Sequence, residues 1–480
     1  MKRIDFAVLT LCLMAGTLRA QETERPVLLT FGEALQLTAT RNPQIAASAY
    51  QEEAAEKEKK AAFGLRLPNV GVAGTYAHLS DDMEIDMNGL KQPVGQLAGQ
   101  LGGLLPPAVA GQIGGIVNQL TARNWAMVLQ KKDMALAGAT VTMPVFTGGK
   151  INAANNAAKI RLAEARTQGD QTRNSLVSEL AERYFGLSLA NQVVEVRRQV
   201  LEGMEKHLHD AQALEANGMI ARTERLYAEM HVAEARKDLL KAIRDARTME
   251  SALGNTLNDQ GAYTPVTTLF FVQGIEDVNY FKTLALEKSP LLKQVELKKE
   301  LAQEGAKAIR ADFMPQVALM GGYDFYNYQL TDLAPTWAVG AGVKLTIFNG
   351  LNREYKYSAA KSQVRQVNAL QEKANADLST MVEKVYNEMM TGEDQLASIE
   401  TALKFAEEYL RAKEKAFLEG MAPSSDVVDA RLNLAKIKTE RLQAAYTYDV
   451  LLARLLELCG DSETYLAYIT DRPITPIRFE

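Results

Sequence analysis

Two aspartates three residues apart are the groups in this chain whose type and spacing could act together. Asp426 and Asp429 would share one face of a helix, because side chains at positions i and i+3 are neighbours on a helix surface. Carboxylates repeated around a symmetry axis form rings of charge, which bias the passage of ions through a pore. The alternative is that Asp426, together with Ser424 and Ser425, stabilises the beginning of a helix. Both hypotheses stay open from the residues alone.

The four histidines of the chain do not form a catalytic or metal-binding motif. His207 and His209 are two residues apart, so on a helix they would point to different sides, unlike the i, i+4 pair that binds zinc. A solvated position or a place in a helical seam is expected for them. The sequence also has no phosphate-binding loop, nucleophile elbow or zinc motif. We therefore expect no enzyme activity, no cofactor and no metal.

The sequence predicts a long helical hairpin between Lys150 and Leu253, which contains His207 and His209. Apolar residues recur in it every seven positions, at Leu180, Leu187, Val194, Leu201 and Leu208. This is the spacing of a left-handed coiled coil. The first arm contains no proline up to Ala216, so it can be one helix about 100 Å long at a rise of about 1.5 Å per residue.

The hairpin occurs twice, at an offset of 202 residues. The five seam positions return, all apolar, as Val382, Met389, Leu396, Leu403 and Leu410. The turns repeat as the pairs Gly218-Met219 and Gly420-Met421. The junctions that lead from strand into helix also repeat, and we expect them at Phe146, Gly148, Gly149, Phe348 and Gly350. A register kept over the whole hairpin indicates internal duplication, with repeat one over 31–255 and repeat two over 278–460 of a mature chain 21–480.

Alternating residues predict two strands in each repeat, over about 68–79, 134–146, 315–330 and 336–348. Each strand has one apolar face and one small or polar face. That pattern suits a barrel wall between lipid and water, and it equally suits the half-buried sheet of a soluble protein. Aromatic residues near the strand ends suit an interfacial girdle or ordinary packing, and they are Tyr323, Phe325, Tyr326, Tyr328 and Trp337.

The first repeat carries an insertion between its two strands. The offset between repeats is 247 residues before it (Tyr76 to Tyr323) and 202 after it (Pro144 to Thr346), and the difference is 45 residues. The insertion includes Gly95–Leu120, which is rich in glycine, leucine and alanine. Barrels place long external loops at this kind of connection, so the segment would lie over a barrel mouth or form a disordered loop.

Composition limits the class of protein. The N-terminal residues 1–20 are typical of a signal peptide, with Lys2-Arg3 before an apolar run and a small residue, Ala20, at its end. The remaining chain has no stretch of about 20 apolar residues, so a membrane could be crossed only by strands. The balance of 54 basic and 59 acidic residues gives no support for nucleic-acid binding.

Four strands are too few to close a barrel, because small barrels need about 8 strands, but three copies would supply twelve. The expected fold is therefore mainly α with a small β part. Tandem-duplicated long coiled-coil hairpins would form a trimeric α-barrel, and four strands per chain would contribute to a twelve-stranded β-barrel.

These features together resemble the TolC family of outer membrane efflux proteins. The resemblance covers nearly all of the mature chain, and it rests on the tandem repeat, the junctions at 144–149 and 347–350, and the Gly-Met-x-x-x-x-[Glu/Asp] turns. It implies a homotrimer in contact with outer membrane lipid, whose barrel continues into a helical tunnel in the periplasm. It also implies two partners, a periplasmic adaptor protein and an inner-membrane pump, which together pass small molecules or proteins to the exterior.

The resemblance also assigns residues to the closed periplasmic tip of such a tunnel. Thr223 and Glu224 match a Thr-Asp pair at the tip. Asp426 and Asp429 match the two aspartates of the constricting rings.

Two further positions concern the gate. Phe417 stands where the founding member of the family has a gating tyrosine, and Ala422 replaces its gating arginine. Because that arginine is missing, we expect the tip to depend on packing of Phe417 with Met219 and Met421.

Two other function classes compete with a duct. A non-pore periplasmic coiled-coil scaffold or adhesin would use the helices, but the paired alternating strands are against it. A hydrolase on a helical frame lacks a nucleophile and base that converge.

Overall fold

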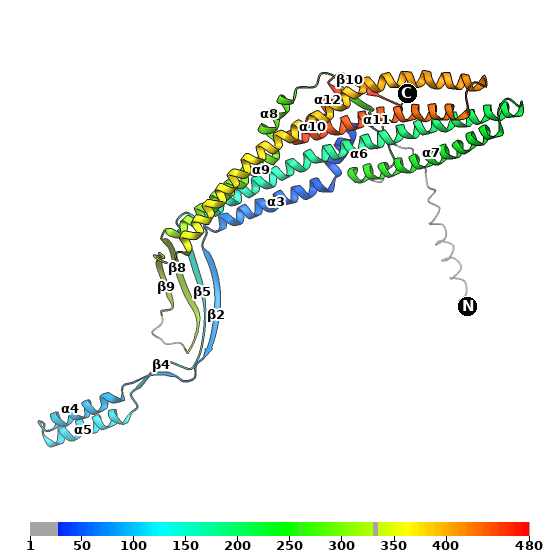
Figure 1. Ribbon diagram of the computed structural model, residues 1–480. Coiled ribbons are helices and arrows are strands. Elements are labelled where there is room, and N and C mark those ends of the chain that lie inside the picture. The colour runs from blue at the N-terminus through cyan, green and yellow to red at the C-terminus, as the bar shows by residue number, and fades with distance from the viewer. Residues whose placement is uncertain (1–26, 260, 330–334, 480) are drawn as a thin grey trace, which may run out of the picture. The chain divides into compact units, whose positions relative to one another are not determined.

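A computed structural model describes residues 27–259, 261–329 and 335–479 of the chain (Figure 1). The predicted signal peptide lies outside the described residues. The chain divides into two compact units. The helical unit comprises Met1–Lys57, Lys159–Ala302 and Gln363–Glu480, and the strand unit comprises Glu58–Ala158 and Gln303–Ser362.

The longest helices form two matched pairs. Helices α6 (Lys150–Ala216) and α10 (Asn352–Leu418) have 67 residues each. Helices α7 (Arg222–Leu257) and α11 (Ser424–Cys459) have 36 residues each. Every boundary in the second pair falls 202 residues after its counterpart in the first, so the predicted tandem hairpins are confirmed.

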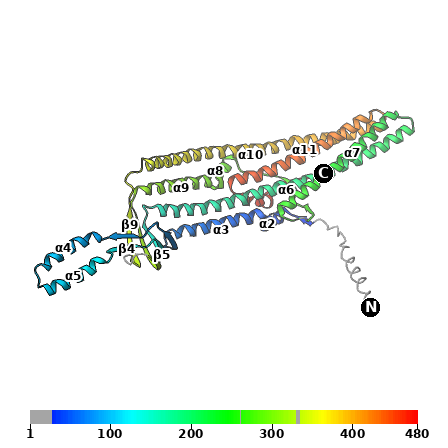
Figure 2. The same ribbon diagram turned by 90° about the horizontal axis from the view of Figure 1, so that it is seen from below.

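Shorter helices complete each repeat (Figure 2). They are α2 (Phe31–Arg41), α3 (Pro43–Gly64), α4 (Lys91–Gly102), α5 (Pro107–Ala122), α8 (Val278–Lys288), α9 (Pro290–Arg310) and α12 (Tyr465–Thr470), with 3₁₀ turns η1 (Asn88–Leu90), η2 (Ala311–Phe313) and η3 (Ser462–Thr464). Proline separates α2 from α3 and α8 from α9, because the residue before a proline avoids the helical conformation. No described helix is both long and apolar enough to cross a membrane.

The predicted seam is buried. Leu180 and Val382, which occupy equivalent positions in the two repeats, are both 0% exposed. They belong to one hydrophobic core that includes residues of α6, α7, α10 and α11. Burial of side chains at this spacing is what holds long helices together, because an isolated helix gains little from its own hydrogen bonds.

Two small strand pairs extend this core. Strand β1 (Val27–Leu29) pairs in parallel with β6 (Tyr263–Pro265), and β7 (Leu269–Val272) pairs antiparallel with β10 (Ile474–Ile477). The hydroxyl of Tyr184, on α6, donates to the carbonyl of Leu29 at 2.6 Å. This bond satisfies a buried phenol while it fixes the first strand against the helices.

The strand unit contains a four-stranded antiparallel sheet. Its order is β2 (Asn69–His78), β5 (Asp133–Phe146), β8 (Gln316–Tyr328) and β9 (Trp337–Lys344). The central pair, β5 and β8, joins the first repeat to the second. Strands β2 and β9 form the two edges of the sheet.

The register gathers the apolar residues of all four strands on one face. Val70 lies opposite Val141, which lies opposite Gly321, which lies opposite Val339. Directly opposed residues share a face of a sheet. One residue along, the neighbouring row contains only Gly71, Thr140, Gly322 and Ala338. The sheet therefore has one apolar face and one face of small and polar residues.

The apolar face is uncovered in the single chain. Val72 is 72% exposed, Val339 is 76% exposed and Val343 is 70% exposed. The aromatic residues at the strand ends are exposed as well, from 47% for Tyr328 to 66% for Trp337. Within the described parts of the single chain, neither these aromatic residues nor the apolar face of the sheet is packed against a core.

Strand β9 ends at Lys344, before the predicted end at 348. The guanidinium of Arg353 donates to the carbonyl oxygens of Thr346 at 2.7 Å and Ile347 at 3.3 Å. These carbonyls are the groups that a longer strand would offer to its neighbour. The arginine therefore ends the strand and begins the junction into α10.

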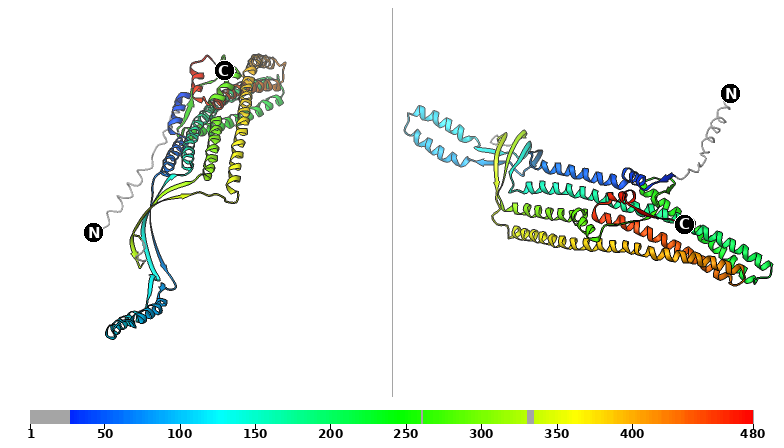
Figure 3. Two further views of the ribbon diagram at one scale, coloured as in Figure 1. Left: turned by 90° about the vertical axis from the view of Figure 1, so that its left-hand side faces the viewer. Right: turned by 90° about the horizontal axis from the view of Figure 1, so that it is seen from above.

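The insertion forms regular strands and helices, so the prediction of a disordered loop was wrong. Strands β3 (Met83–Asp86) and β4 (Ala126–Gln130) form an antiparallel pair, and helices α4 and α5 form a hairpin at the end of it. Figure 3 shows the hairpin, in light blue, beyond the end of the four strands. Pro107 is the first residue of α5, where the fixed φ of proline and its missing N–H favour a helix start.

Candidate pore constriction at the helical turns

Glycine in a left-handed conformation closes each long helix. Gly218 has a φ of 70° and Gly420 a φ of 73°, which side chains other than glycine rarely adopt. After each glycine the methionine N–H returns to the helix, from Met219 to Leu214 at 2.9 Å and from Met421 to Ala416 at 2.8 Å. The repeated Gly-Met pair is thus a helix end followed by an exposed methionine, 57% exposed at Met219 and 71% at Met421.

The two turns lie together, as predicted. A buried cluster unites all four long helices near the turns, and it comprises Ala211, Ala228, Leu410, Phe417, Val427 and Ala430. Alanine at three of the six positions lets the backbones approach closely. The two hairpins are therefore packed on each other at their ends.

Phe417 lies inside this cluster rather than beside the exposed methionines. It is 1% exposed, and its ring centroid is 4.5 Å from that of His207 on α6. The packing of Phe417 with Met219 and Met421 stays a prediction. The buried ring of Phe417 lies between the two hairpins of one chain, whereas both methionines are exposed.

A carboxylate and a histidine reach the beginning of α11 from the other hairpin. The Glu224 carboxylate accepts a hydrogen bond from the Ser424 N–H at 2.7 Å. The Ser424 hydroxyl is 2.6 Å from Nε2 of His207. The first N–H groups of a helix have no partner within it and attract negative charge, so Glu224 caps the helix of the other repeat.

His207 is buried in the seam and His209 is exposed, as their spacing predicts. Burial, and next the positive charge of Arg431, lower the pKa of His207 from 6.5 to about 4. The imidazole is therefore neutral at physiological pH. Among the described residues, no group of three or more histidine, cysteine, aspartate or glutamate side chains could hold a metal ion.

The two aspartates of the predicted rings differ from each other. Asp426 accepts a hydrogen bond from the ammonium of Lys413 at 2.6 Å, and this bond raises the pKa of Lys413. Asp426 also lies in the first turn of α11, where its negative charge suits the helix N-terminus, and Pro423, the N-cap residue, forms no side-chain cap of its own. Asp429 is exposed, and it has no ion-pair partner within the described parts of the chain. Thr223, in the first turn of α7, is also exposed.

One interaction near the turns was missed by the sequence analysis. Arg431 on α11 forms an ion pair with Glu414 on α10. Its guanidinium lies directly against Gly203 of α6, where even a methyl group would overlap it. The signal in the sequence was Gly203, one of three glycines within α6, because a glycine inside a helix costs about 1 kcal/mol relative to alanine unless something needs the space.

The strand-to-helix junctions use the predicted glycines. Gly148, Gly149 and Gly350 have φ values of 63°, 94° and 69°. A side chain at Gly148 would meet the carbonyl of Ala311, so the backbone passes close to the second repeat there. Phe146 and Phe348 are both exposed.

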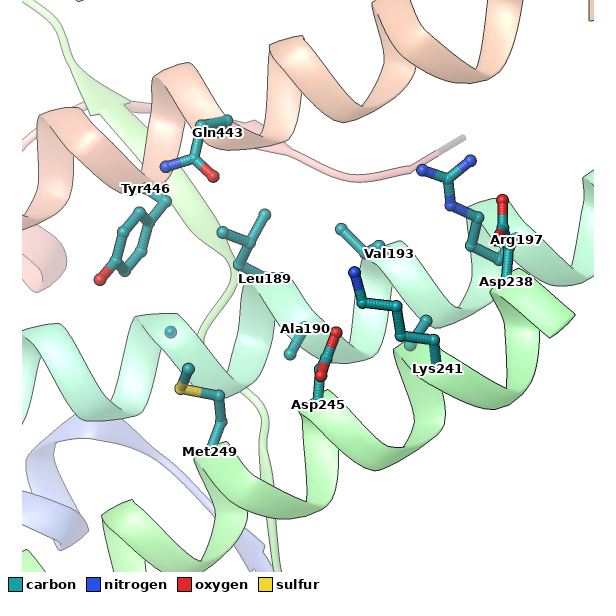
Figure 4. A pocket seen from close by; sticks show the side chains of 12 residues that line it. Leu189, Ala190, Val193, Arg197, Asp238, Lys241, Asp245, Met249, Gln443 and Tyr446 are labelled. Atoms are coloured by element: carbon teal, nitrogen blue, oxygen red, sulfur yellow. The ribbon is translucent and has the colours of Figure 1, made fainter. Parts of the chain in front are cut away.

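A groove of about 450 Å³ lies between α6, α7 and α11 (Figure 4). Arg197 and Asp238 lie at one end of it, and Met249 and Tyr446 at the other. No serine, cysteine or histidine lines the groove. Its lining combines side chains of both charges with apolar ones.

Comparison with protein families decides the identity of the chain. The model of a family described as "Outer membrane efflux protein" matches residues 34–259 and 283–461. The chain belongs to the outer membrane efflux protein family. The two matched segments follow the two repeats, and the predicted family is confirmed.

Solved structures of such channels share the fold. The outer membrane protein VceC of Vibrio cholerae is 16% identical, with a TM-score of 0.68, over 90% of this chain and 96% of that one. The CmeC outer membrane channel of Campylobacter jejuni is 12% identical, with a TM-score of 0.68, over 92% and 90%. The MtrE outer membrane channel of Neisseria gonorrhoeae, in its open state, is 17% identical, with a TM-score of 0.67, over 90% and 89%. No curated protein sequence matches the chain.

Membership in the outer membrane efflux protein family fixes the general function. The chain is an outer membrane protein of an efflux system, and its fold is shared with solved outer membrane proteins and channels. The family is one of transport channels and not of enzymes. The scaffold and hydrolase hypotheses are therefore set aside.

Proposed function

We propose that three copies of this chain form one continuous export duct, which passes small molecules or proteins from a pump and its adaptor to the exterior. The observation that carries this proposal is the uncovered apolar face of the four-stranded sheet. An apolar surface of this kind is stable against lipid and unstable against water. The opposite face, with its glycine, threonine and alanine, suits a water-filled interior.

The open edges of the sheet support assembly from several copies. Strands β2 and β9 each have one side without a partner among the described strands. Unpaired edges attract another strand, so β2 of one copy would pair with β9 of the next. Three copies then give a closed sheet of twelve strands, and the six long hairpins continue it as a tunnel.

The turns support a constriction at the other end of the tunnel. In a trimer each residue near the turns is repeated three times around the axis. We infer that Asp429 supplies a ring of unpaired carboxylates, and that Asp426 supplies a ring already neutralised by Lys413. Thr223 and Glu224 lie beside these rings, and Met219 and Met421 are exposed at the turns.

The partners follow from the position of the constriction. A duct that is closed at its tip must be opened by whatever delivers the solute, so an adaptor should dock on the helices near the turns. The groove between α6, α7 and α11, with both charges along an apolar floor, fits the helices of such a protein. An inner-membrane pump would then supply the solute through the adaptor.

Native mass measurement in detergent tests the assembly directly. The expected species has three copies of the chain. A mutated chain with Val72→Asp and Val339→Asp, two changes on the apolar face, should lose insertion into lipid vesicles, whereas Thr140→Asp on the opposite face should keep it. A monomer or a dimer as the dominant species, or equal insertion of both variants, would overturn the proposal.

A further inference from the structure

The helical hairpin of the insertion is held firmly to the strands that carry it. At its base the Asn88 amide donates to the Asn124 side chain at 2.7 Å and accepts from the Trp125 N–H at 3.0 Å. The indole of Trp125 donates to the carbonyl of Leu120 at 2.9 Å, at the end of α5. These hydrogen bonds join the hairpin to the paired strands β3 and β4, so the orientation of the hairpin relative to these strands is fixed.

Each helix of the hairpin has two apolar stripes. One stripe is half-buried in the contact between the helices, at Val94 and Ala98 on α4 and at Ile113 and Val117 on α5. The second stripe is exposed, and it comprises Leu97 at 59% and Leu101 at 51% on α4, Leu104 at 83% in the turn after α4, and Val109 at 42%, Ile116 at 58% and Leu120 at 48% on α5. Its members are three, four or seven residues apart, which is the spacing of residues that pack in helical bundles.

Both exposed stripes lie on the same face of the hairpin. In each helix the exposed stripe precedes the half-buried stripe by roughly a sixth of a turn, at about 100° per residue. The two helices run antiparallel, so these equal rotations bring both stripes to one side. The hairpin therefore presents a single apolar face several residues wide.

The segment that carries this face has no charge. Gln92–Ala122 contains no aspartate, glutamate, lysine or arginine, although 24% of the whole chain is charged. Identical copies that meet on a symmetry axis place each side chain beside its own copy, so any charge in the contact would be repelled by itself. A charge-free apolar face is what such a contact needs.

We propose that the α4–α5 hairpins of three subunits bind one another through this face and form a six-helix bundle at the outer end of the duct. This inference rests on the proposed trimer. The hairpin follows β3 and precedes β4, and these strands connect it to β2 and β5 of the sheet whose edges would join the copies. The occupant of the apolar face is therefore a second copy of the same hairpin. The insertion then adds a helical cap beyond the sheet.

Cysteine crosslinking in the intact protein tests the bundle. Ile116→Cys places a thiol on the apolar face, and Asn118→Cys places one on the opposite side of the same helix, since two residues are about 200° apart. Both positions are exposed in the single chain. The native Cys459 is 0% exposed and serves as an unreactive background. With a short bis-maleimide we expect at least a tenfold excess of crosslinked chains for Ile116→Cys.

The outcomes separate this inference from the proposed function. Native mass measurement on both cysteine variants first establishes the trimer. A trimer with equal crosslinking at the two positions would overturn the bundle and leave the duct intact, whereas the absence of a trimer would overturn both.

Lipid is the competing occupant of the apolar face. A bimane label on Ile116→Cys should keep its fluorescence in vesicles that contain brominated lipid, because the face is buried between hairpins. Strong quenching there, without crosslinking, would assign the face to lipid and reject the bundle.

Discussion

The carboxylate of Glu224, in the first repeat, accepts a hydrogen bond of 2.7 Å from the backbone N–H of Ser424, in the second. Glu224 and Asp426 occupy equivalent positions, 202 residues apart, but their carboxylates bind different partners. Glu224 caps a helix of the other hairpin, and Asp426 pairs with Lys413. The two hairpins of one chain are thus joined by a contact that the duplication alone would not create.

Loss of the Glu224 carboxylate should loosen the contact between the hairpins. Glu224→Ala leaves the first N–H of α11 without its partner, at a cost of about 1–2 kcal/mol. Hydrogen exchange should show a roughly tenfold faster rate at the amide of Ser424. The matched control is Glu229→Ala, which removes an exposed carboxylate paired with Arg225. An unchanged rate at Ser424 would mean that this bond does not hold the hairpins.

The two aspartates should contribute unequally to ion selectivity. Asp429→Ala removes an unpaired carboxylate and should lower the preference for cations strongly, whereas Asp426→Ala removes one that Lys413 already neutralises and should lower it little. Lys413→Ala should raise the preference instead, because it frees Asp426. Reversal potentials across a planar bilayer in a salt gradient measure all three variants. The ring assignment fails if Asp429→Ala leaves the reversal potential unchanged.

Acid should weaken the contact around His207. Its pKa in the folded chain is about 4, below the value of 6.5 for a free histidine, so the folded state disfavours the protonated form. The stabilisation from the neutral ring is complete above pH 6.5, and it is lost as the pH falls toward 4. A proton there would face Arg431, while Asp210 and Glu224 offset part of that repulsion.

Crosslinking between cysteines at the two turns measures how the contact around His207 depends on pH. Met219→Cys with Met421→Cys should crosslink less at pH 4.5 than at pH 7.5. His207→Gln keeps a partner for Ser424 without a titrating group, so it should flatten the profile. A profile that is equally steep with glutamine would assign the acid sensitivity to other groups.

Gly203 and Arg431 should be coupled. Gly203→Ala places a methyl group where the guanidinium lies, so it should destabilise the protein by about 1–3 kcal/mol as an overpacking substitution. In an Arg431→Ala background the same change should be neutral or slightly stabilising, because alanine favours a helix. A thermal double-mutant cycle measures the difference. Additive effects of the two changes would show that the close approach does not matter.

The periodic elements were predictable from the sequence, and most contacts between them were not. Seven-residue spacing and the offset of 202 residues predict the hairpins and their turns, because both depend on patterns local to the chain. Alternation at Val70 and Val339 predicts strands with one apolar face, although only the register shows that the four faces coincide. Arg353 ends β9 early through carbonyl contacts that no local pattern reveals.

The turns of the candidate site were predictable, but its contacts were not. Asp426 and Asp429 lie three positions apart on α11, and the constriction assigned to them stays a prediction. That Lys413 neutralises Asp426 depends on how α10 lies beside α11, and that Phe417 packs on His207 depends on how α10 lies beside α6. For the insertion, the sequence left a segment over a barrel mouth and a disordered loop as alternatives. The structure has helices α4 and α5 there in place of a disordered loop, with a proline at the first position of α5.

Helices α6 and α10 have equal lengths, so their turns lie at the same distance along the helix axis. Seven residues added to α6 alone would move its turn by about 10 Å along the axis, and Glu224 would no longer meet Ser424. The same addition to both helices would keep the seam, the buried cluster and the cap in step. An insertion or deletion in one helix therefore requires an equal change in the other. The length of the duct would then change only by multiples of seven residues, made in both helices at once.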